Sequence, residues 1–271
     1  MEECKYCKKY TGGFERIDVH EFMGNGSYNG DIDLRWKATN GLMDDIIKKY
    51  KNPKILNLAM GNGHGSIFIS KMGYNLVSNE VDEYFLSTAR KNAEENNVKL
   101  EIREDDWDNI YFSHEYKESE FDFIFCLGNS FPTYIYSEEE RSTCLKGFWK
   151  ILKPGGTLLF DARNYDYFIN NKDFILKDPE NNFRYDGKCT YLKNNDLKFF
   201  YTNINDQIVH VCAKCFSTKQ YTCMDLYLAT EERVKKMIKD VLGDVDLEIF
   251  YDYQKEKPEH YDFVQYKLTK K

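Results

Sequence analysis

A glycine-rich turn constrains the fold of this chain more than any other feature. The apolar run Ile55 to Ala59 precedes the turn, glycines stand at Gly61, Gly63 and Gly65, and apolar residues at helical spacing follow. A buried strand that enters a helix through such a turn is typical of a nucleotide-binding βα unit, because glycine tolerates the backbone angles and lets a ligand approach the main chain. The first helical turn also offers unpaired N–H groups. We therefore expect a polar ligand here, while a purely structural glycine loop remains the alternative.

Strands alternate with helices on both sides of this turn. We expect strands at 55–58, 75–80, 99–103, 121–126 and 157–160, helices between them, and an earlier helix over about 34–50. Ser137 and the three glutamates after it indicate the start of a helix. We expect that helix to end before Lys153-Pro154-Gly155-Gly156, which turns into the fifth strand. This order predicts an α/β fold with a doubly wound, mostly parallel, seven-stranded sheet.

The pattern changes between about residues 183 and 228. Short alternating runs at 198–201, 208–216 and 224–228 have no helix between them and predict a small antiparallel β insertion. A helix from Thr230 to about Leu242 and strands near 247–253 and 263–268 follow. The expected organisation is an N-terminal arm and helix over the active site (1–50), a cofactor-binding α/β core (51–182), the insertion (183–228), and a C-terminal helix with two strands that complete the sheet (229–271).

Composition argues against two classes of partner. The chain has 271 residues, a net charge of −7 and a pI near 5.4, with no basic run interleaved with aromatics, so a nucleic-acid surface is not expected. No apolar stretch approaches the ~20 residues of a membrane span, and the first residues lack the apolar core of a signal peptide. We expect a cytoplasmic protein. A homo-oligomer is compatible with the sequence, which leaves the oligomeric state open.

The eight cysteines include two CxxC pairs, Cys4/Cys7 and Cys212/Cys215. Together these pairs could form a four-thiolate zinc site. However, Cys212 and Cys215 lie in the alternating run 208–216, where their side chains would point to opposite faces of a strand. We therefore expect unrelated free thiols and no metal, with the zinc site as the alternative.

Polar residues or glycines follow all five predicted strands, at the edge where open parallel sheets bind ligands. Glu80 ends the second strand, and an acid about 20 residues beyond the first glycine typically binds ribose hydroxyls. Asp106-Trp107 follow the third strand, Gly128-Asn129 the fourth, and Arg163 the fifth. An arginine fork pairs with a carboxylate through two hydrogen bonds, so Arg163 is a plausible anchor for an acidic substrate.

These motifs resemble class I S-adenosylmethionine-dependent methyltransferases over about residues 34–165. The resemblance rests on the Asn57-x-x-x-Gly61-x-Gly63-x-Gly65 turn, Glu80, Asp106-Trp107 and Lys153-Pro154-Gly155-Gly156. Other stretches are narrower and resemble glycine N-methyltransferases and glycine/sarcosine N-methyltransferases. They are Cys126-Leu127-Gly128-Asn129-Ser130-Phe131, Asp161-x-Arg163-Asn164-Tyr165-Asp166, Tyr28-x-Gly30-Asp31-x-x-x-Arg35 and Gly187-Lys188-x-x-Tyr191-x-Lys193.

The resemblance implies S-adenosylmethionine as cofactor and a small amino acid as substrate. It implies that cofactor contacts come from Arg35 (methionyl carboxylate), Ala59, Gly61 and Gly63 (methionyl and ribose), Glu80 (ribose), Asp106 and Trp107 (adenine) and Leu127 (near the sulfonium). It likewise assigns the substrate to Asn129 and Arg163, with Arg163 on the carboxylate, and to Tyr28 and Tyr191, with Tyr28 closing the site.

Two departures from the family pattern leave alternatives open. Asn57 stands where an aspartate is usual, so the turn brings no charge for the cofactor's ammonium group. After Phe131 a histidine often found in the family is absent. A methyltransferase for another small carboxylate-bearing substrate, or a protein that binds S-adenosylmethionine without turnover, are the alternatives. A dinucleotide enzyme is disfavoured, because its turn is typically G-x-G-x-x-G.

Overall fold

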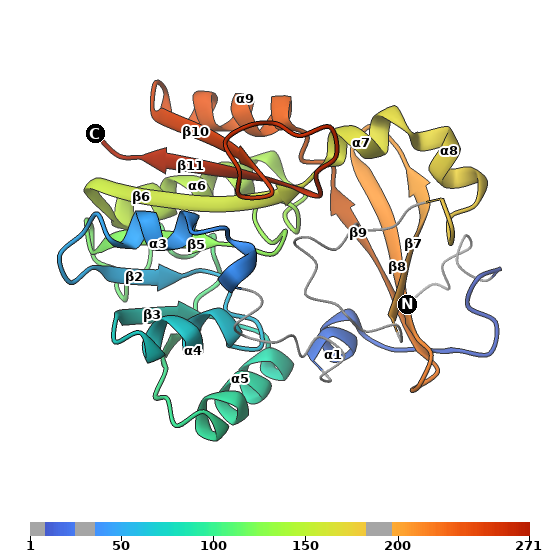
Figure 1. Cartoon of the computed structure of the whole chain (residues 1–271), viewed down its shortest axis with the longest axis horizontal. Coiled ribbons are helices and arrows are strands. Elements are labelled where there is room, and N and C mark those ends of the chain that lie inside the picture. The colour runs from blue at the N-terminus through green and yellow to red at the C-terminus, as the bar shows by residue number, and fades with distance from the viewer. Residues whose placement is uncertain (1–8, 25–35, 183–196) are drawn as a thin grey trace.

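The computed structural model describes residues 9–24, 36–182 and 197–271, which form two β-sheets. Figure 1 shows the larger sheet on the left of the view and the smaller one on the right. Helix α1 (Val19–Gly24) contacts both α5 (Glu83–Glu95) of the larger unit and strand β9 (Gln220–Tyr227) of the smaller one. It therefore lies between α5 and the smaller sheet.

The larger sheet has seven strands in the order β10-β11-β6-β5-β2-β3-β4. The strands from β6 to β4 are parallel, whereas β11 is antiparallel to both β6 and β10. The expected α/β fold with a mostly parallel, seven-stranded sheet is confirmed. The strands are β2 (Lys54–Asn57), β3 (Asn75–Asn79), β4 (Glu101–Arg103), β5 (Phe121–Cys126), β6 (Leu152–Arg163), β10 (Asp246–Tyr251) and β11 (Phe263–Thr269).

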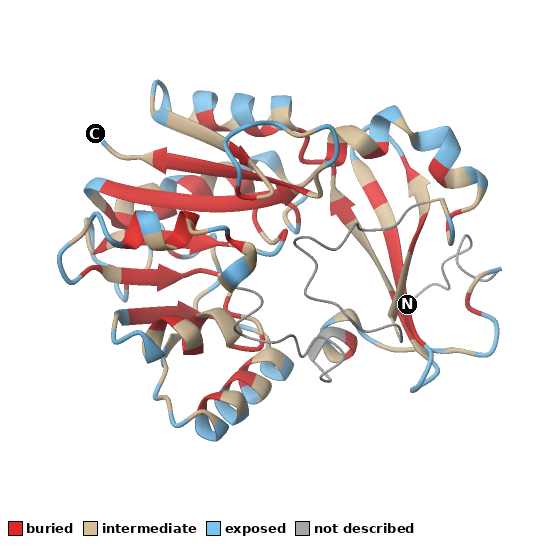
Figure 2. Cartoon of the chain, in the orientation of Figure 1, coloured by how far each residue is buried: buried red, intermediate tan, exposed pale blue. Residues whose placement is uncertain are grey.

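Helices cover both faces of this sheet, and its central strands are buried between them (Figure 2). On one face, α6 (Glu138–Ile151) and α9 (Glu231–Leu242) pack side chains such as Phe148 and Val234 against Leu56 and Leu158. On the other, α3 (Leu42–Ile47) and α4 (His64–Lys71) pack against the alternate strand residues, such as Phe123. Burial on both faces explains why the strands read as continuous apolar runs.

Two of the predicted helix starts are confirmed by their caps. The Ser137 side chain accepts a hydrogen bond from the Glu140 N–H, and the Thr230 side chain accepts one from the Arg233 N–H. Each cap satisfies a backbone donor that the helix itself leaves unpaired.

Two expected elements differ in the structure. The single helix over 34–50 is interrupted, because Asn40 (φ 50°) and Gly41 (φ 81°) are both left-handed, and α3 begins only after them. The Lys153–Gly156 turn lies inside β6 rather than before it. The chain passes from α6 directly into β6, and the register against β5 shifts between Phe121 and Phe123 to accommodate the extra residues.

The smaller sheet has the order β1-β9-β8-β7 and contains the expected antiparallel insertion. Strands β7 (Leu197–Ile204), β8 (Ile208–Cys215) and β9 pair antiparallel, as predicted. The short strand β1 (Glu15–Arg16) was not expected and pairs parallel to β9. Helices α7 (Tyr165–Asn170) and α8 (Lys172–Lys177) connect β6 toward this sheet.

The cysteines of β8 correct one expectation and confirm another. Cys212 packs with Phe200 whereas Cys215 packs with Phe22, so the two side chains lie on opposite faces, as the alternation predicts. Cys212 is not a free thiol, however, because it forms a disulfide with Cys223 directly across the strand pair. Cys4 and Cys7 lie outside the described residues.

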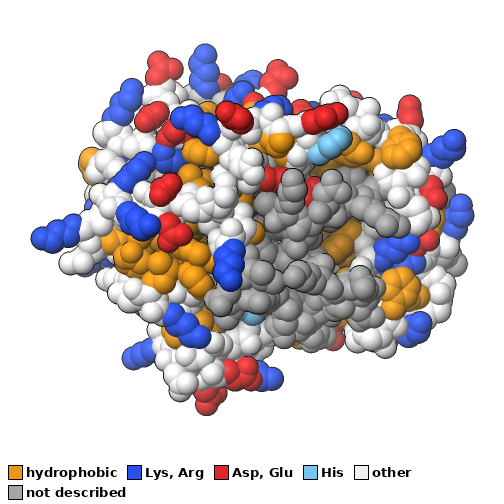
Figure 3. Space-filling view, viewed as in Figure 1, with side chains coloured by type: hydrophobic (Ala, Val, Ile, Leu, Met, Phe, Trp, Pro, Cys, Tyr) orange, Lys and Arg blue, Asp and Glu red, His pale blue; other side chains and the backbone are white. Residues whose placement is uncertain are grey.

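The described surface mixes both signs of charge on the face shown in Figure 3. Among the described helices, none combines the length and apolar character needed to cross a bilayer.

Candidate functional site

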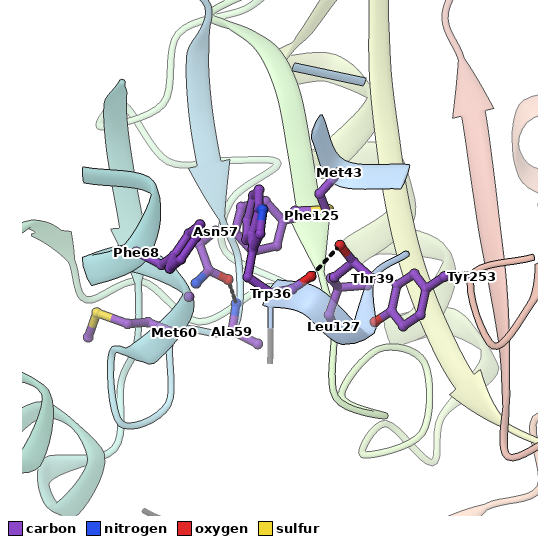
Figure 4. Close-up of a pocket in the computed structure, with 11 residues that line it drawn as sticks. Trp36, Thr39, Met43, Asn57, Ala59, Met60, Phe68, Phe125, Leu127 and Tyr253 are labelled. Atoms are coloured by element: carbon purple, nitrogen blue, oxygen red, sulfur yellow. Dashed lines mark hydrogen bonds between the residues drawn. The ribbon is translucent and has the colours of Figure 1, made fainter. Parts of the chain in front are cut away.

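A pocket opens at the carboxyl ends of β2 and β5, under the turn that precedes α3 (Figure 4). Of the predicted site residues, Ala59 and Leu127 line it, together with Asn57 and Gly65 of the glycine turn. Its walls are otherwise mainly apolar and aromatic. The lining is completed by Trp36, Thr39, Met43, Met60, Phe68, Phe125 and Tyr253.

Gly61 and Gly63 of the glycine turn are not among the residues that line the pocket, and both have a left-handed backbone. Gly63 precedes α4 with φ 84°, and Gly61 has φ 54°. A Cβ at Gly61 would have no atom within 4 Å, so the main chain there faces open space that a ligand can approach. A Cβ at Gly63 would lie 3.1 Å from the Cβ of Ala89 on α5. Gly63 therefore serves close packing, whereas Gly61 leaves room for a ligand.

Replacing each glycine by alanine separates these roles. Gly63→Ala is expected to lower the free energy of unfolding by about 1–3 kcal/mol more than Gly61→Ala, because both alanines carry the positive-φ strain but only the former meets Ala89. Urea denaturation of the two variants measures the difference. Equal losses would contradict the packing role of Gly63.

Asn57 belongs to a buried polar network. Its Nδ2 donates to Ser66 Oγ at 2.9 Å, and Ser78 Oγ donates to the same oxygen at 2.9 Å. The Ala59 N–H donates to Asn57 Oδ1 at 3.3 Å. Asn57 is 3 % exposed, and its neutral amide satisfies this network without burying a charge.

This network predicts how much stability is lost when Asn57 is replaced by the aspartate that is usual in the family. Asn57→Asp is expected to destabilise the unliganded protein by about 1–3 kcal/mol at neutral pH, because a buried carboxylate replaces the donor to Ser66. Denaturation midpoints measure the effect. Asn75→Asp, at an exposed position that begins β3, is the matched control and is expected to change stability little. Similar losses in both variants would contradict the proposed role of the network.

Glu80 reaches back from the end of β3 to the glycine turn. Its Oε2 accepts from the Gly61 N–H at 2.8 Å, and its Oε1 accepts from the N–H groups of Val81 and Asp82. Burial raises the pKa of Glu80, an effect that these three N–H groups oppose and that the charge of Asp82 reinforces. The carboxylate is thus held beside the open backbone of Gly61.

Asp106 and Trp107 lie differently from one another. Asp106 is exposed, and its carbonyl accepts from the Asn109 N–H. Trp107 is half-buried and donates its Nε1–H to the Leu58 carbonyl at 2.8 Å, next to the end of β2. Its ring meets Phe131 edge-on within the core. Trp107 therefore anchors the loop after β4 at the edge of the sheet where the glycine turn begins.

Asn129 and Arg163 meet at the ends of β5 and β6. Asn129 has φ 65°, and its N–H donates to Asp161 Oδ1 at 2.7 Å. Its Oδ1 accepts from the Arg163 N–H at 2.9 Å, and its Nδ2 donates to Tyr165 Oη at 3.1 Å. The Arg163 guanidinium lies over the Phe263 ring, 4.4 Å from its centroid. The loop after β5 is thereby bonded to the end of the adjacent parallel strand β6.

Several residues that line the pocket could not be predicted from the sequence. Trp36 stacks on Phe68 with ring centroids 4.7 Å apart, donates its Nε1–H to Asp44 Oδ2 and presents its carbonyl to Thr39 Oγ1. No local pattern indicates this stacking, because Trp36 and Phe68 lie on different elements. Tyr28, Arg35 and Tyr191 lie outside the described residues.

The site fits a bound nucleoside with an amino-acid tail. Apolar walls and one amide surround the pocket, the backbone of Gly61 is approachable, and the half-buried Glu80 carboxylate lies beside Gly61. Residues 55–156 match the methyltransferase domain family. The matched residues and the mostly parallel seven-stranded sheet both support a class I methyltransferase domain, with S-adenosylmethionine as its cofactor.

Among curated proteins, the chain is similar to glycine and glycine/sarcosine N-methyltransferases. The chain is 30 % identical to the glycine/sarcosine N-methyltransferase of Halorhodospira halochloris over 61 % of this chain and 58 % of that protein. It is also 30 % identical to that of Aphanothece halophytica over 51 % and 52 %, and 28 % identical to mouse glycine N-methyltransferase over 53 % and 51 %. The chain thus spans between half and three-fifths of the length of these curated relatives.

Solved structures agree over nearly the whole chain. An S-adenosylmethionine-dependent methyltransferase from Clostridium acetobutylicum superposes with a TM-score of 0.64 at 18 % identity, covering 93 % of this chain and 96 % of that one. A Pyrococcus horikoshii protein gives 0.64 at 15 %, covering 94 % and 100 %. At these identities the likeness concerns the fold.

Proposed function

We propose that the chain is an S-adenosylmethionine-dependent N-methyltransferase that acts on the amine of a small amino acid, glycine and/or sarcosine. The observation that carries this proposal is the junction between the loop after β5 and the end of β6. The stretches that resemble glycine and glycine/sarcosine N-methyltransferases there are joined by Asn129, which bonds Asp161 and the Arg163 backbone. The relatives named for glycine and sarcosine support the same substrate class.

The proposed cofactor contacts follow the sheet edge. Glu80 binds the ribose beside the backbone of Ala59, Gly61 and Gly63, and Asp106 with Trp107 contacts the adenine. Leu127 lies near the sulfonium, and Arg35 binds the methionyl carboxylate.

The proposed substrate contacts come from the β5–β6 junction. Arg163 holds the substrate carboxylate. Asn129 donates one Nδ2 hydrogen to Tyr165, and the second hydrogen is the group that remains for a substrate. Tyr28 and Tyr191 complete this side of the site in the proposal.

The chemistry requires alignment more than a strong base. When bound, S-adenosylmethionine would supply a methyl group on a sulfonium for direct transfer to the substrate nitrogen. Such a transfer would move the positive charge to the nitrogen without forming an oxyanion, so no oxyanion hole is needed. The protein has to present a neutral amine behind the methyl group, and Arg163 with Asn129 can do so by orienting the substrate while its proton leaves to water.

Mass spectrometry of the products from glycine, sarcosine and dimethylglycine tests the proposal and counts the methyl groups added. Methylation of glycine or sarcosine is the expected result. A product from another small carboxylic acid alone would indicate the first alternative. Tight cofactor binding with no product from any amino acid would instead favour a non-catalytic S-adenosylmethionine-binding protein, which Asn57 also suggests.

A further inference from the structure

Two cross-strand residue pairs of the smaller sheet place side chains that can bind a metal on the same face. β8 and β9 place Cys212 opposite Cys223 and His210 opposite Asp225. Residues two apart on a strand share a face, so all four side chains lie together. Ligand atoms of His210, Cys212 and Cys223 lie within 4.8 Å of one another. Zinc–sulfur and zinc–nitrogen bonds of about 2.3 and 2.1 Å place tetrahedral ligands roughly 3.4–3.8 Å apart. Small side-chain rotations would therefore bring these three ligand atoms to the spacing of a tetrahedral zinc site.

Asp225 prepares the histidine for such a role. Its Oδ1 lies 2.5 Å from His210 Nδ1. A metal-bound histidine commonly donates one ring N–H to a carboxylate, which orients the ring and directs the other nitrogen to the ion. With Nδ1 held by Asp225, Nε2 is the nitrogen that would face a metal.

The surroundings of the two cysteines are apolar. Cys212 is 1 % exposed and packs with Phe200, while Tyr10 and Cys223 close the cluster. The ring centroids of Tyr10 and Phe200 lie 5.5 Å apart. An apolar shell that limits access of water strengthens the attraction between thiolates and a cation.

We propose that, in the reduced protein, Cys212, Cys223 and His210 bind one zinc-class divalent ion, with Asp225 positioning His210 and the fourth position open to water. In the structure the two cysteines are joined as a disulfide. A dithiol reductant supplies two electrons and two protons, becomes a disulfide itself and frees both thiols. The ion then displaces the two thiol protons. A disulfide oxidant that takes two electrons from the two thiolates and two protons from solvent becomes a dithiol, re-forms the Cys212–Cys223 bond and releases the ion. The same pair therefore has a metal-bound and a disulfide state.

Cobalt titration of the full chain tests this proposal independently of any methyltransferase activity. The protein is reduced with a phosphine, freed of it and titrated anaerobically with Co²⁺. We expect one equivalent to produce a thiolate-to-cobalt charge-transfer band, which Zn²⁺ then removes. Protein with the Cys212–Cys223 disulfide intact, verified by peptide mapping, is expected to show no such band.

Variants assign the ligands. Cys223→Ser and His210→Gln are expected to weaken binding by at least about 100-fold, and Asp225→Asn by about 10–100-fold, as for other residues that orient a ligand. Cys215→Ser is the matched control, because Cys215 packs on the opposite face with Phe22. It is expected to bind like the wild type.

The outcomes that overturn the proposal are distinct. Absence of the band in the reduced wild type would do so, as would undiminished binding by Cys223→Ser. Loss of binding in a Cys4→Ser/Cys7→Ser variant with circular dichroism unchanged would place the ion on the N-terminal pair instead. The circular dichroism spectrum of each variant shows whether it has folded.

Discussion

Arg163→Ala is expected to lower kcat/KM for the amino-acid substrate by at least about 100-fold while the cofactor dissociation constant stays nearly unchanged. Truncating one partner of a hydrogen-bonded charge pair costs about 2–5 kcal/mol, and each 1.4 kcal/mol is tenfold. Cofactor affinity is measured by calorimetry and turnover by product mass spectrometry. Arg163→Lys is expected to retain part of the activity, since it keeps the charge but not the fork.

The control for this variant is Arg90→Ala. Arg90 pairs with Glu104 on the exposed side of α5, away from the β5–β6 junction, so its loss removes an arginine without touching the proposed substrate site. The assignment of Arg163 fails if substrate affinity and turnover survive in Arg163→Ala. Because the Arg163 guanidinium also lies over the Phe263 ring, the stability of Arg163→Ala is measured in parallel to show that the variant is folded.

Glu80→Gln is expected to weaken cofactor binding by about 10–100-fold. The amide nitrogen replaces one of the two carboxylate oxygens and cannot accept, so either the bond from Gly61 or the two bonds from Val81 and Asp82 are lost. A neutral group also accepts ribose hydroxyls more weakly than a carboxylate. Calorimetric titration with S-adenosylmethionine measures the effect. Glu83→Gln, at an exposed position in the first turn of α5, is the matched control and is expected to bind normally.

The pH dependence of cofactor binding by the wild type is expected to show the role of Glu80 as well. Burial raises the pKa of Glu80, so its carboxylate is protonated at a higher pH than an exposed glutamate. Cofactor affinity is therefore expected to fall as the pH drops through that raised pKa, and Glu80→Gln should lose this dependence. The effect on the stability of the unliganded protein has the opposite sign. Between the pKa that Glu80 has in the unfolded chain and its higher pKa in the folded protein, the folded state binds more protons than the unfolded state. The wild type is therefore expected to lose stability relative to Glu80→Gln as the pH rises through this range. Identical pH profiles for both proteins would contradict the role of Glu80.

Features set by neighbouring residues could be predicted. The caps at Ser137 and Thr230 depend on bonds within one helical turn, and the apolar runs of β2 and β5 depend on burial from both sides. The residues that follow these strands could be assigned to one edge of the sheet, because the carboxyl ends of parallel strands lie at the same edge. The interruption before α3 could not be predicted, because the left-handed pair Asn40-Gly41 lies inside a stretch whose sequence pattern indicates a continuous helix.

Contacts between distant elements could not be predicted. The Trp36–Phe68 stack that lines the pocket joins two helical segments, and β1 pairs with a strand about 200 residues later in the chain, a loop closure without local signal. The Asn129 network likewise depends on the register of β5 against β6.

The sequence by itself determined the alternation of strands and helices, the glycine turn and the chemistry at each strand end, because these depend on periodicity and on residues adjacent in the chain. Only the tertiary structure decided that Asn57 sits in a network with Ser66 and Ser78, that Glu80 folds back on Gly61, and that Cys212 faces Cys223 beside His210. Each of these depends on how separate elements pack and on strand register, where a slip of one residue would turn every side chain to the other face.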